Sequence, residues 1–319
     1  MEPFLSVPEM KRIRKVGMDC GCEYTSFERF RGIPPYSRYD HSLGCALIVW
    51  RFTKSREQAL SALFHDIATP VFAHTVDFLN GDHLQQESTE AGTAEMIRNS
   101  EEITALLSDL GIDTESVTDY HRYPVADNDA PKLSSDRLEY TLSNAVRYGF
   151  LSVSEAKECF EDLIVFNQPD GTPELSFQHD EKARIFARAA LSCSKVYVSE
   201  EDRYAMQRLS ELLRDAIRKD VLQKKDLYGT EEEIIQRIEE DEELSEAWRD
   251  FRSLSLMIQN PEDIPEDRKR IIPAKKRFID PLAEGRRLSD TDAAFAEAIR
   301  EYLNEPQDIP LCGISRTAL

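Results

Sequence analysis

The sequence predicts an all-α protein with one minor β-hairpin. Only 12 of the 319 residues are glycine, and long stretches carry apolar residues three and four positions apart, the spacing of one face of an α-helix. A strand pair is expected at one place, where LIVF at 163–166 and ELSF at 174–177 flank a Pro-Asp-Gly-Thr-Pro turn at 169–173. Proline and glycine favour such turns.

Two helices are expected early in the chain, over residues 41–53 and 55–65. The first is rich in apolar residues and should therefore lie deep in the core. A further amphipathic helix is expected to begin at Asp136; its apolar positions are Leu138, Leu142 and Ala145.

The second half of the chain shows the helical spacing most clearly in residues 201–225. The apolar stripe there consists of Met206, Leu209, Leu212, Leu213, Ile217 and Val221. Thr230 and Glu233 then form a capping-box pattern, which predicts one helix from that point through an acidic segment to Trp248. We interpret the acidic face of this helix as solvated surface.

The composition changes near residue 261. Six of the 15 prolines lie in residues 261–319, together with a basic stretch from Arg268 to Arg287. We therefore expect a helical domain over residues 1–260, with its motifs in about 25–150, followed by a Pro-rich, partly basic C-terminal appendage over 261–319.

The charge balance argues against two classes of partner. The chain has 60 Asp and Glu against 40 Lys and Arg, a formal net charge of -20. Such a surface repels phosphate backbones and anionic membranes, so neither nucleic acid nor a membrane is an expected partner.

The sequence also predicts a cytoplasmic protein. The longest nearly apolar run, Leu43 to Trp50, is far shorter than the roughly 20 residues of a membrane span, and the first residues lack the pattern of a secretory signal. The six cysteines are scattered, which favours reduced thiols. The sequence leaves the oligomeric state open, a homo-oligomer included.

Four residues form a candidate metal site. His41 lies near the start of the first core helix and the His65–Asp66 pair near the end of the next, so antiparallel packing would bring them together. A fourth ligand must come from elsewhere, and Asp136 is the best candidate. Histidine nitrogens and aspartate oxygens together suit a borderline divalent ion.

Three motifs in order are similar to those of the HD-domain superfamily of metal-dependent phosphohydrolases. They are RYDHSLG at 38–44, HDIATPVFAH at 65–74 and DRLEY at 136–140. The closest resemblance is to the deoxynucleoside triphosphate triphosphohydrolase branch, and it covers roughly residues 25–150. It implies an all-α HD fold and a divalent cofactor, for which Mn, Fe, Zn, Ni and Mg are all candidates.

The resemblance also implies roles for further residues. His74 and Asp77 match the acid/base pair, in which the carboxylate orients the imidazole. Cationic positions that hold substrate phosphates correspond to Arg38 and Arg137, and Tyr140 corresponds to an aromatic residue that lines the sugar site. A His-Glu pair of the family corresponds to Gln86 and Glu87, which makes Glu87 a candidate substrate ligand.

Other positions depart from the family pattern. Thr69 replaces an active-site histidine, Ser143 replaces an arginine, and Asn144 replaces the aspartate that recognises the sugar 3′-hydroxyl. The metal ligands are all retained, whereas recognition of the sugar and triphosphate is altered. We therefore do not expect the standard deoxynucleoside triphosphates to be the preferred substrates.

The predicted function is metal-dependent hydrolysis of a small phosphorylated substrate, a nucleotide being the favoured class. A P-loop, a G-x-S-x-G elbow and a C-x-x-C zinc pattern are all missing from the sequence. Two alternatives stay open: an HD phosphodiesterase, and a non-catalytic HD protein that senses a nucleotide. Some residues also have simpler interpretations, since Arg38 and Arg137 could form ordinary ion pairs and His74 could be structural.

Overall fold

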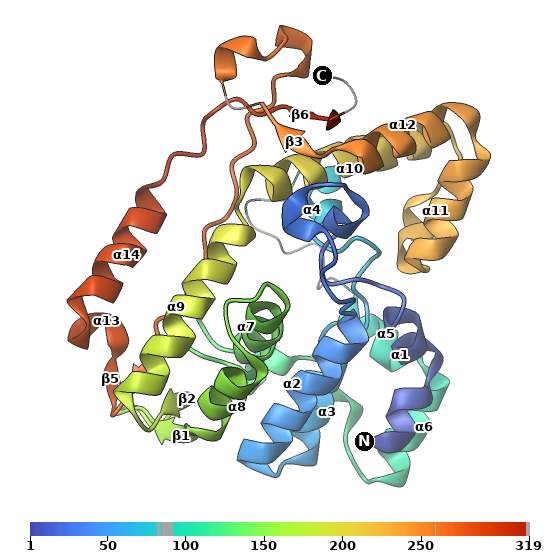
Figure 1. Ribbon diagram of the computed structural model, residues 1–319. Helices are drawn as coiled ribbons and strands as arrows, with labels where there is room; N and C mark the ends of the chain where they lie inside the picture. Colours follow the sequence, from blue (N-terminus) through green and yellow to red (C-terminus); the bar gives the residue numbers. More distant parts are fainter. Residues whose placement is uncertain (82–83, 85–91, 259, 317–319) are drawn as a thin grey trace.

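The computed structural model describes residues 1–81, 84, 92–258 and 260–316 and is mostly helical, as predicted (Figure 1). Within these residues the α-helices are α1 (Pro8–Ile13), α2 (Arg38–Thr53), α3 (Arg56–Phe64), α4 (Thr75–Asn80), α5 (Thr93–Asn99), α6 (Glu101–Asp109), α7 (Ser135–Arg147), α8 (Val153–Glu161), α9 (Asp180–Val196), α10 (Glu200–Arg218), α11 (Glu231–Glu240), α12 (Glu242–Ser253), α13 (Leu288–Thr291) and α14 (Ala293–Asn304). None of these helices is long and apolar enough to cross a bilayer.

The helices expected at 41–53, at 55–65 and from Asp136 are present as α2, α3 and α7. A serine caps each of them. Ser37 and Asp40 form a capping box at the start of α2, while Ser55 and Ser134 accept hydrogen bonds from backbone N–H groups of α3 and α7. These side chains satisfy amide groups that have no partner within the helix, so they fix where each helix begins.

The expected single helix from residue 230 to Trp248 is wrong in one respect, because it is two helices. Thr230 and Glu233 form the predicted capping box of α11, but the backbone is extended at Asp241. The Asp241 side chain accepts a hydrogen bond from Leu244 N and caps α12 instead. Aspartate stabilises a helix start better than a helix interior, which explains the break.

The predicted hairpin is confirmed and belongs to a larger sheet. The strands are β1 (Leu163–Asn167), β2 (Pro173–Phe177), β3 (Leu256–Met257), β4 (Leu282–Ala283), β5 (Arg286–Arg287) and β6 (Gly313–Ile314). Strands β1 and β2 pair antiparallel with Leu163 opposite Phe177. Strand β4 then pairs parallel with β2 and antiparallel with β5, and β3 pairs with β6 elsewhere.

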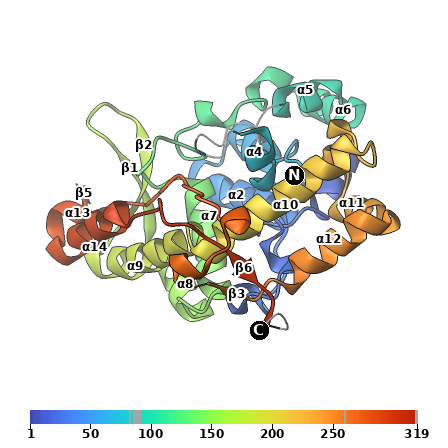
Figure 2. The ribbon, with the colours of Figure 1, turned by 90° about the horizontal axis from the view of Figure 1, so that it is seen from above.

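The segment after residue 260 packs against the helical body. Helices α13 and α14 lie beside α9, as Figure 2 shows. Ile279, Phe295 and Ile299 join the apolar cluster that contains Phe177 of β2 and Phe186 of α9. The division into domains at residue 260 stays a prediction, but the two parts share a core.

Candidate metal centre

Three helices position the residues predicted to bind a metal. His41 lies in the first turn of α2, His65 and Asp66 follow the last residue of α3, and Asp136 lies in the first turn of α7. Helix α2 packs against both α3 and α7. Figure 1 shows α2 and α3 beside α7, and the four side chains come together where these helices meet.

The donor atoms of the four residues lie close to one another. His41 Nε2 is 3.0 Å from Asp136 Oδ1 and 3.2 Å from His65 Nε2. Asp66 Oδ2 is 3.6 Å from His65 Nε2 and 3.9 Å from His41 Nε2. The distance between His65 Nε2 and Asp136 Oδ1 is also 3.6 Å.

The spacings among His41, His65 and Asp136 fit the coordination shell of one ion. Two donor atoms that each bind a metal at about 2.1 Å lie roughly 3.0 Å apart at a right angle and roughly 3.4 Å apart at the tetrahedral angle. The donors are imidazole nitrogens and carboxylate oxygens, which suit a divalent transition metal. The side chain of His41 is 2% exposed and that of Asp136 is 21% exposed, so the site is more open to solvent on the α7 side.

Cys45 lies beside this group and was not predicted from the sequence. His41, Cys45, His65 and Asp136 offer donor atoms within 4.8 Å of one another. However, Cys45 Sγ is 3.6 Å from His41 Nδ1 and 3.8 Å from Nε2, so it lies alongside the ring and not in front of Nε2. Burial raises the pKa of the Cys45 thiol to about 12. The four residues with donors this close thus include Cys45, and Asp66 as a ligand stays a prediction.

A second shell of hydrogen bonds orients His41. Its Nδ1 lies 2.5 Å from Glu139 Oε2, and Tyr36 donates a hydrogen bond to the same oxygen. A carboxylate on the second ring nitrogen typically fixes the tautomer and leaves Nε2 for the metal. A Cβ at Gly44 would lie 2.6 Å from Glu139 Cγ, so glycine there makes room for the carboxylate.

Sequence analysis missed this role of Glu139, although a signal was present. Glu139 lies three residues after Asp136, so both side chains occupy one face of α7. Tyr36 gave no such signal, because it belongs to the irregular segment before α2.

Arg38 forms an ion pair with Asp66, one of the predicted ligands. Its Nη1 is 2.9 Å from Asp66 Oδ2, and Thr69 donates a hydrogen bond of 2.7 Å to Asp66 Oδ1. Burial would raise the pKa of Asp66, but the charges of Arg38 and His65 outweigh it and hold that pKa below its usual range. Thr69, which replaces a family histidine, thus orients a predicted ligand.

Arg137 points to a neighbouring loop. Its Nε donates a hydrogen bond of 2.7 Å to Lys132 O. Its Nη2 donates hydrogen bonds to the backbone and side-chain oxygens of Asn128 and lies 3.1 Å from Asp127 Oδ1. Its predicted contact with substrate stays a prediction. Asp127 also lies 2.9 Å from Nδ1 of His121, and the Tyr120 ring packs on both His121 and His65.

Tyr140 and Asn144 lie on one face of α7, further along the helix than the candidate ligand Asp136. The Tyr140 ring centroid is 6.3 Å from that of His41 and 6.2 Å from that of Tyr197. Asn144 donates a hydrogen bond of 2.8 Å to Tyr197 Oη and accepts one of 2.7 Å from Arg147 Nη1. Its amide is therefore already engaged on both sides. The hydroxyl of Ser143 donates to Glu139.

His74 and Asp77 form a close pair at the start of α4. His74 Nδ1 is 2.8 Å from Asp77 Oδ2, Asp77 is fully buried, and the His74 side chain is 28% exposed. Phe72 and Ala73, directly before His74, have φ angles of 58° and 39°. Such left-handed backbone is costly in L-residues and is often found at functional sites.

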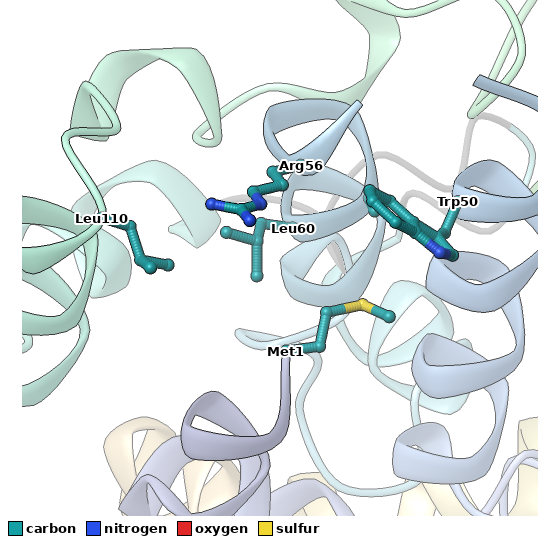
Figure 3. Close-up of a pocket in the computed structure, with 6 residues that line it drawn as sticks. Met1, Trp50, Arg56, Leu60 and Leu110 are labelled. Carbon is teal, nitrogen blue, oxygen red and sulfur yellow. The ribbon is translucent and has the colours of Figure 1, made fainter. Parts of the chain in front are cut away.

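The remaining candidate cannot be placed. Glu87, like Gln86 and His83, lies outside the described residues. A cavity of about 400 Å³ lies elsewhere, between α2, α3 and the end of α6 (Figure 3). Its lining consists of Met1, Trp50, Arg56, Ala59, Leu60 and Leu110, so no predicted site residue borders it.

Two curated proteins and one solved structure are similar to this chain. No family model matches the chain. It is 27% identical over 203 residues to the uncharacterized protein YdhJ of Bacillus subtilis and 26% identical over 171 residues to the metal-dependent phosphohydrolase cns2 of Cordyceps militaris. The matched regions cover 62% and 53% of this chain but only 60% and 47% of those relatives.

A solved structure shows the same fold over nearly the whole chain. A phosphohydrolase from Bacteroides thetaiotaomicron superposes with a TM-score of 0.67 at 12% identity, covering 99% of this chain and 95% of its own. At that identity the likeness shows the fold alone. The similarity to cns2 supports the predicted metal-dependent phosphohydrolase family. Neither comparison supports assignment to the triphosphohydrolase branch.

Proposed function

We propose that this chain is a metal-dependent phosphohydrolase that acts on a phosphate ester or nucleotide through a mononuclear His41, His65, Asp66 and Asp136 site. One observation carries the proposal: His41, His65 and Asp136 offer donor atoms 3.0–3.6 Å apart, and Asp66 Oδ2 lies 3.6–3.9 Å from the two histidines. The similarity to a metal-dependent phosphohydrolase supports the same reaction class.

A divalent ion bound there would supply Lewis-acid polarisation of a phosphoryl oxygen and a water of lowered pKa. The protein's own part is to hold the ligands in place. Arg38 and Thr69 orient the Asp66 carboxylate, and Glu139 orients the His41 imidazole.

His74 is the proposed acid/base group. Asp77 accepts a hydrogen bond from Nδ1 of His74 and so leaves Nε2 as the atom that moves a proton. The buried carboxylate keeps the imidazole in one orientation, and the positive φ angles of Phe72 and Ala73 aim the start of α4.

The test is turnover after metal reconstitution. Protein loaded with manganese should hydrolyse p-nitrophenyl phosphate, a chromogenic ester with one phosphate group. A screen of nucleoside mono-, di- and triphosphates and cyclic dinucleotides then identifies the favoured substrate. Metal-loaded protein that hydrolyses none of these compounds would contradict the proposal.

The same screen tests substrate choice. Asn144 already forms hydrogen bonds with Tyr197 and Arg147. Ser143 cannot supply the positive charge that an arginine would. We therefore expect release of inorganic triphosphate from the standard deoxynucleotides at well below about 1 per second, the lower end of typical turnover. Faster release would show that sugar and phosphate contacts come from other residues.

Two alternatives are separated by these measurements. A nucleotide sensor, which the replacement of a histidine by Thr69 favours, would bind nucleotide with metal and turn over no ester. A phosphodiesterase would cleave cyclic dinucleotides in preference to monoesters.

A further inference from the structure

The segment between the predicted ligand Asp66 and the proposed acid/base residue His74 is buried without being helical. Residues 67–73 are all buried, and they follow turns and irregular backbone between α3 and α4. Buried backbone outside helices and strands must find its hydrogen-bond partners elsewhere in the molecule. The partners of this segment therefore decide where His74 lies relative to Asp66.

Arg12, in the last turn of α1, binds the first part of the segment. Its Nη2 donates hydrogen bonds of 2.8 Å to both Ile67 O and Thr69 O. Its Nη1 donates one of 3.3 Å to Gly229 O, just before α11. A guanidinium can bind three carbonyl oxygens at once because its donors form a rigid planar fork. Arg12 thus joins this segment to a turn that is distant in the sequence.

The packing of α1 holds this guanidinium in place. Met10 and Ile13, on either side of Arg12, are fully buried in the apolar cluster that also contains Ile67. Burial lowers the pKa of Arg12 to about 10, although the charge of Asp66 opposes the change. The side chain therefore stays charged at neutral pH, and among the described residues its hydrogen bonds all go to backbone oxygens.

The later part of the segment is bound to the same region of the chain. Val71 N donates a hydrogen bond of 2.8 Å to Leu227 O. The Phe72 ring packs edge-on against the Tyr24 ring, with centroids 6.1 Å apart, and Tyr24 donates a hydrogen bond of 2.8 Å to Glu231. Both parts of the segment are thus fixed to the stretch of chain that leads into α11.

We propose that Arg12 is a positioning residue, which sets the place of His74 relative to the metal site by binding the carbonyl oxygens of Ile67 and Thr69. This inference rests on the proposed function, because it explains how the proposed acid/base group is held. The contacts of Arg12 are with the backbone of the segment, whereas other side chains orient Asp66. Loss of Arg12 should therefore affect turnover more than metal binding.

Turnover of p-nitrophenyl phosphate by the full chain tests this role, at a manganese concentration that saturates every variant. In Arg12→Gln we expect kcat to fall roughly 10–100-fold, the scale of a small displacement of a catalytic group, while KM and bound manganese stay nearly the same. Arg12→Lys keeps the charge and one donor group, so it should recover part of the loss. If Arg12→Gln does not fold, Arg12→Lys serves for the same comparisons.

Lys11→Gln is the matched control, because it removes the same charge from an exposed position of the same helix. It should leave kcat unchanged. A double variant then separates the positioning of His74 from general damage. If Arg12 acts through His74, Arg12→Gln should have almost no effect in protein that already carries His74→Ala. An equal fold-loss in both backgrounds, or an unchanged kcat in Arg12→Gln, would overturn the inference.

Hydrogen exchange keeps the inference testable if no ester is hydrolysed. In Arg12→Gln, peptides that cover residues 67–73 should exchange roughly tenfold faster, the scale of one lost hydrogen bond, while peptides of α7 should not change. Lys11→Gln should match the unaltered protein throughout. That pattern would support the role of Arg12 in holding this segment even though the proposed function had failed. Equal exchange of residues 67–73 in all three proteins would overturn it.

Discussion

The metal side and the proposed substrate side of the site are built from very different parts of the chain. The metal side consists of His41, His65, Asp66 and Asp136, all carried at helix ends by α2, α3 and α7. The proposed substrate side combines Tyr140 and Asn144 of α7 with Tyr197, which follows α9. Short motifs encode the first side, whereas the second depends on how distant segments pack.

The comparison teaches that the two sides can change independently. Arg38 and Glu139, beside the proposed ligands, match the motifs, while Thr69, Ser143 and Asn144 depart from them. Asn144 forms hydrogen bonds with Tyr197 and Arg147. Within the described part of the chain, none of these three residues has a hydrogen bond to a proposed metal ligand. Substrate choice can therefore shift while the metal geometry stays the same.

The largest expected effect comes from breaking the metal side itself. Asp66→Ala removes a proposed ligand and leaves Arg38 buried without its carboxylate. We expect loss of bound metal and of all hydrolase activity, measured by elemental analysis and p-nitrophenyl phosphate turnover. Asp40→Asn, at an exposed helix-cap position of α2, is the control and should keep its metal. Normal metal content in Asp66→Ala would contradict the ligand assignment.

A second prediction separates turnover from metal binding. His74→Ala should retain metal and lose roughly 10²–10⁴-fold in turnover, the usual contribution of a positioned acid/base group. Asp77→Asn should cause a smaller loss, because it only removes the orienting carboxylate. Turnover equal to that of the unaltered protein would make His74 a structural residue.

A smaller effect is expected from the residue that orients His41. Glu139→Gln should weaken metal affinity roughly 10–100-fold, as for other second-shell partners of metal-bound histidines. Competition with a fluorescent chelator measures this affinity. Tyr36→Phe, which removes only one hydrogen bond to Glu139, should weaken it less. The hypothesis fails if Glu139→Gln binds metal as tightly as the unaltered protein.

The last prediction concerns the effect of pH on metal affinity, which is small for each step of pH. Burial lowers the pKa of His41, but its neighbours Cys45, Tyr36 and Asp136 raise it, with a net value well above the ordinary one. The ring must lose a proton before Nε2 can bind metal, so affinity should fall as pH falls, by roughly tenfold per pH unit for one released proton. Chelator competition between about pH 6 and pH 8 tests this slope. An affinity that stays constant over this range would rule out proton release from His41.

The sequence allowed the helical fold and the meeting of four predicted ligands to be anticipated, because both depend on local patterns. Helix periodicity and serine caps define α2, α3 and α7, and the ligands lie at fixed places in those helices. The break between α11 and α12 at Asp241 was not predicted, because a capping aspartate cannot be told from the other acidic residues of an acidic run.

The partners of the site residues could not be predicted in the same way. The sequence indicated that Arg38 and Arg137 are cations, but only the packing shows that Asp66 and Asp127 already pair with them. Tyr197 lies far along the sequence from every motif, so no spacing connected it with the site. Long-range contacts of this kind depend on the whole fold and leave no local pattern.

The attachment of the segment around Asp280 to the loop at Pro131 has a consequence for biosynthesis. A chain folds as it leaves the ribosome, N-terminal parts first. Helices α2, α3 and α7 are complete long before Asp280 is made, so the proposed metal ligands can assemble on the nascent chain. The segment around Asp280 is added only when β4 pairs with β2. The proposed metal centre would thus form before the last part of the chain bonds to the loop at Pro131.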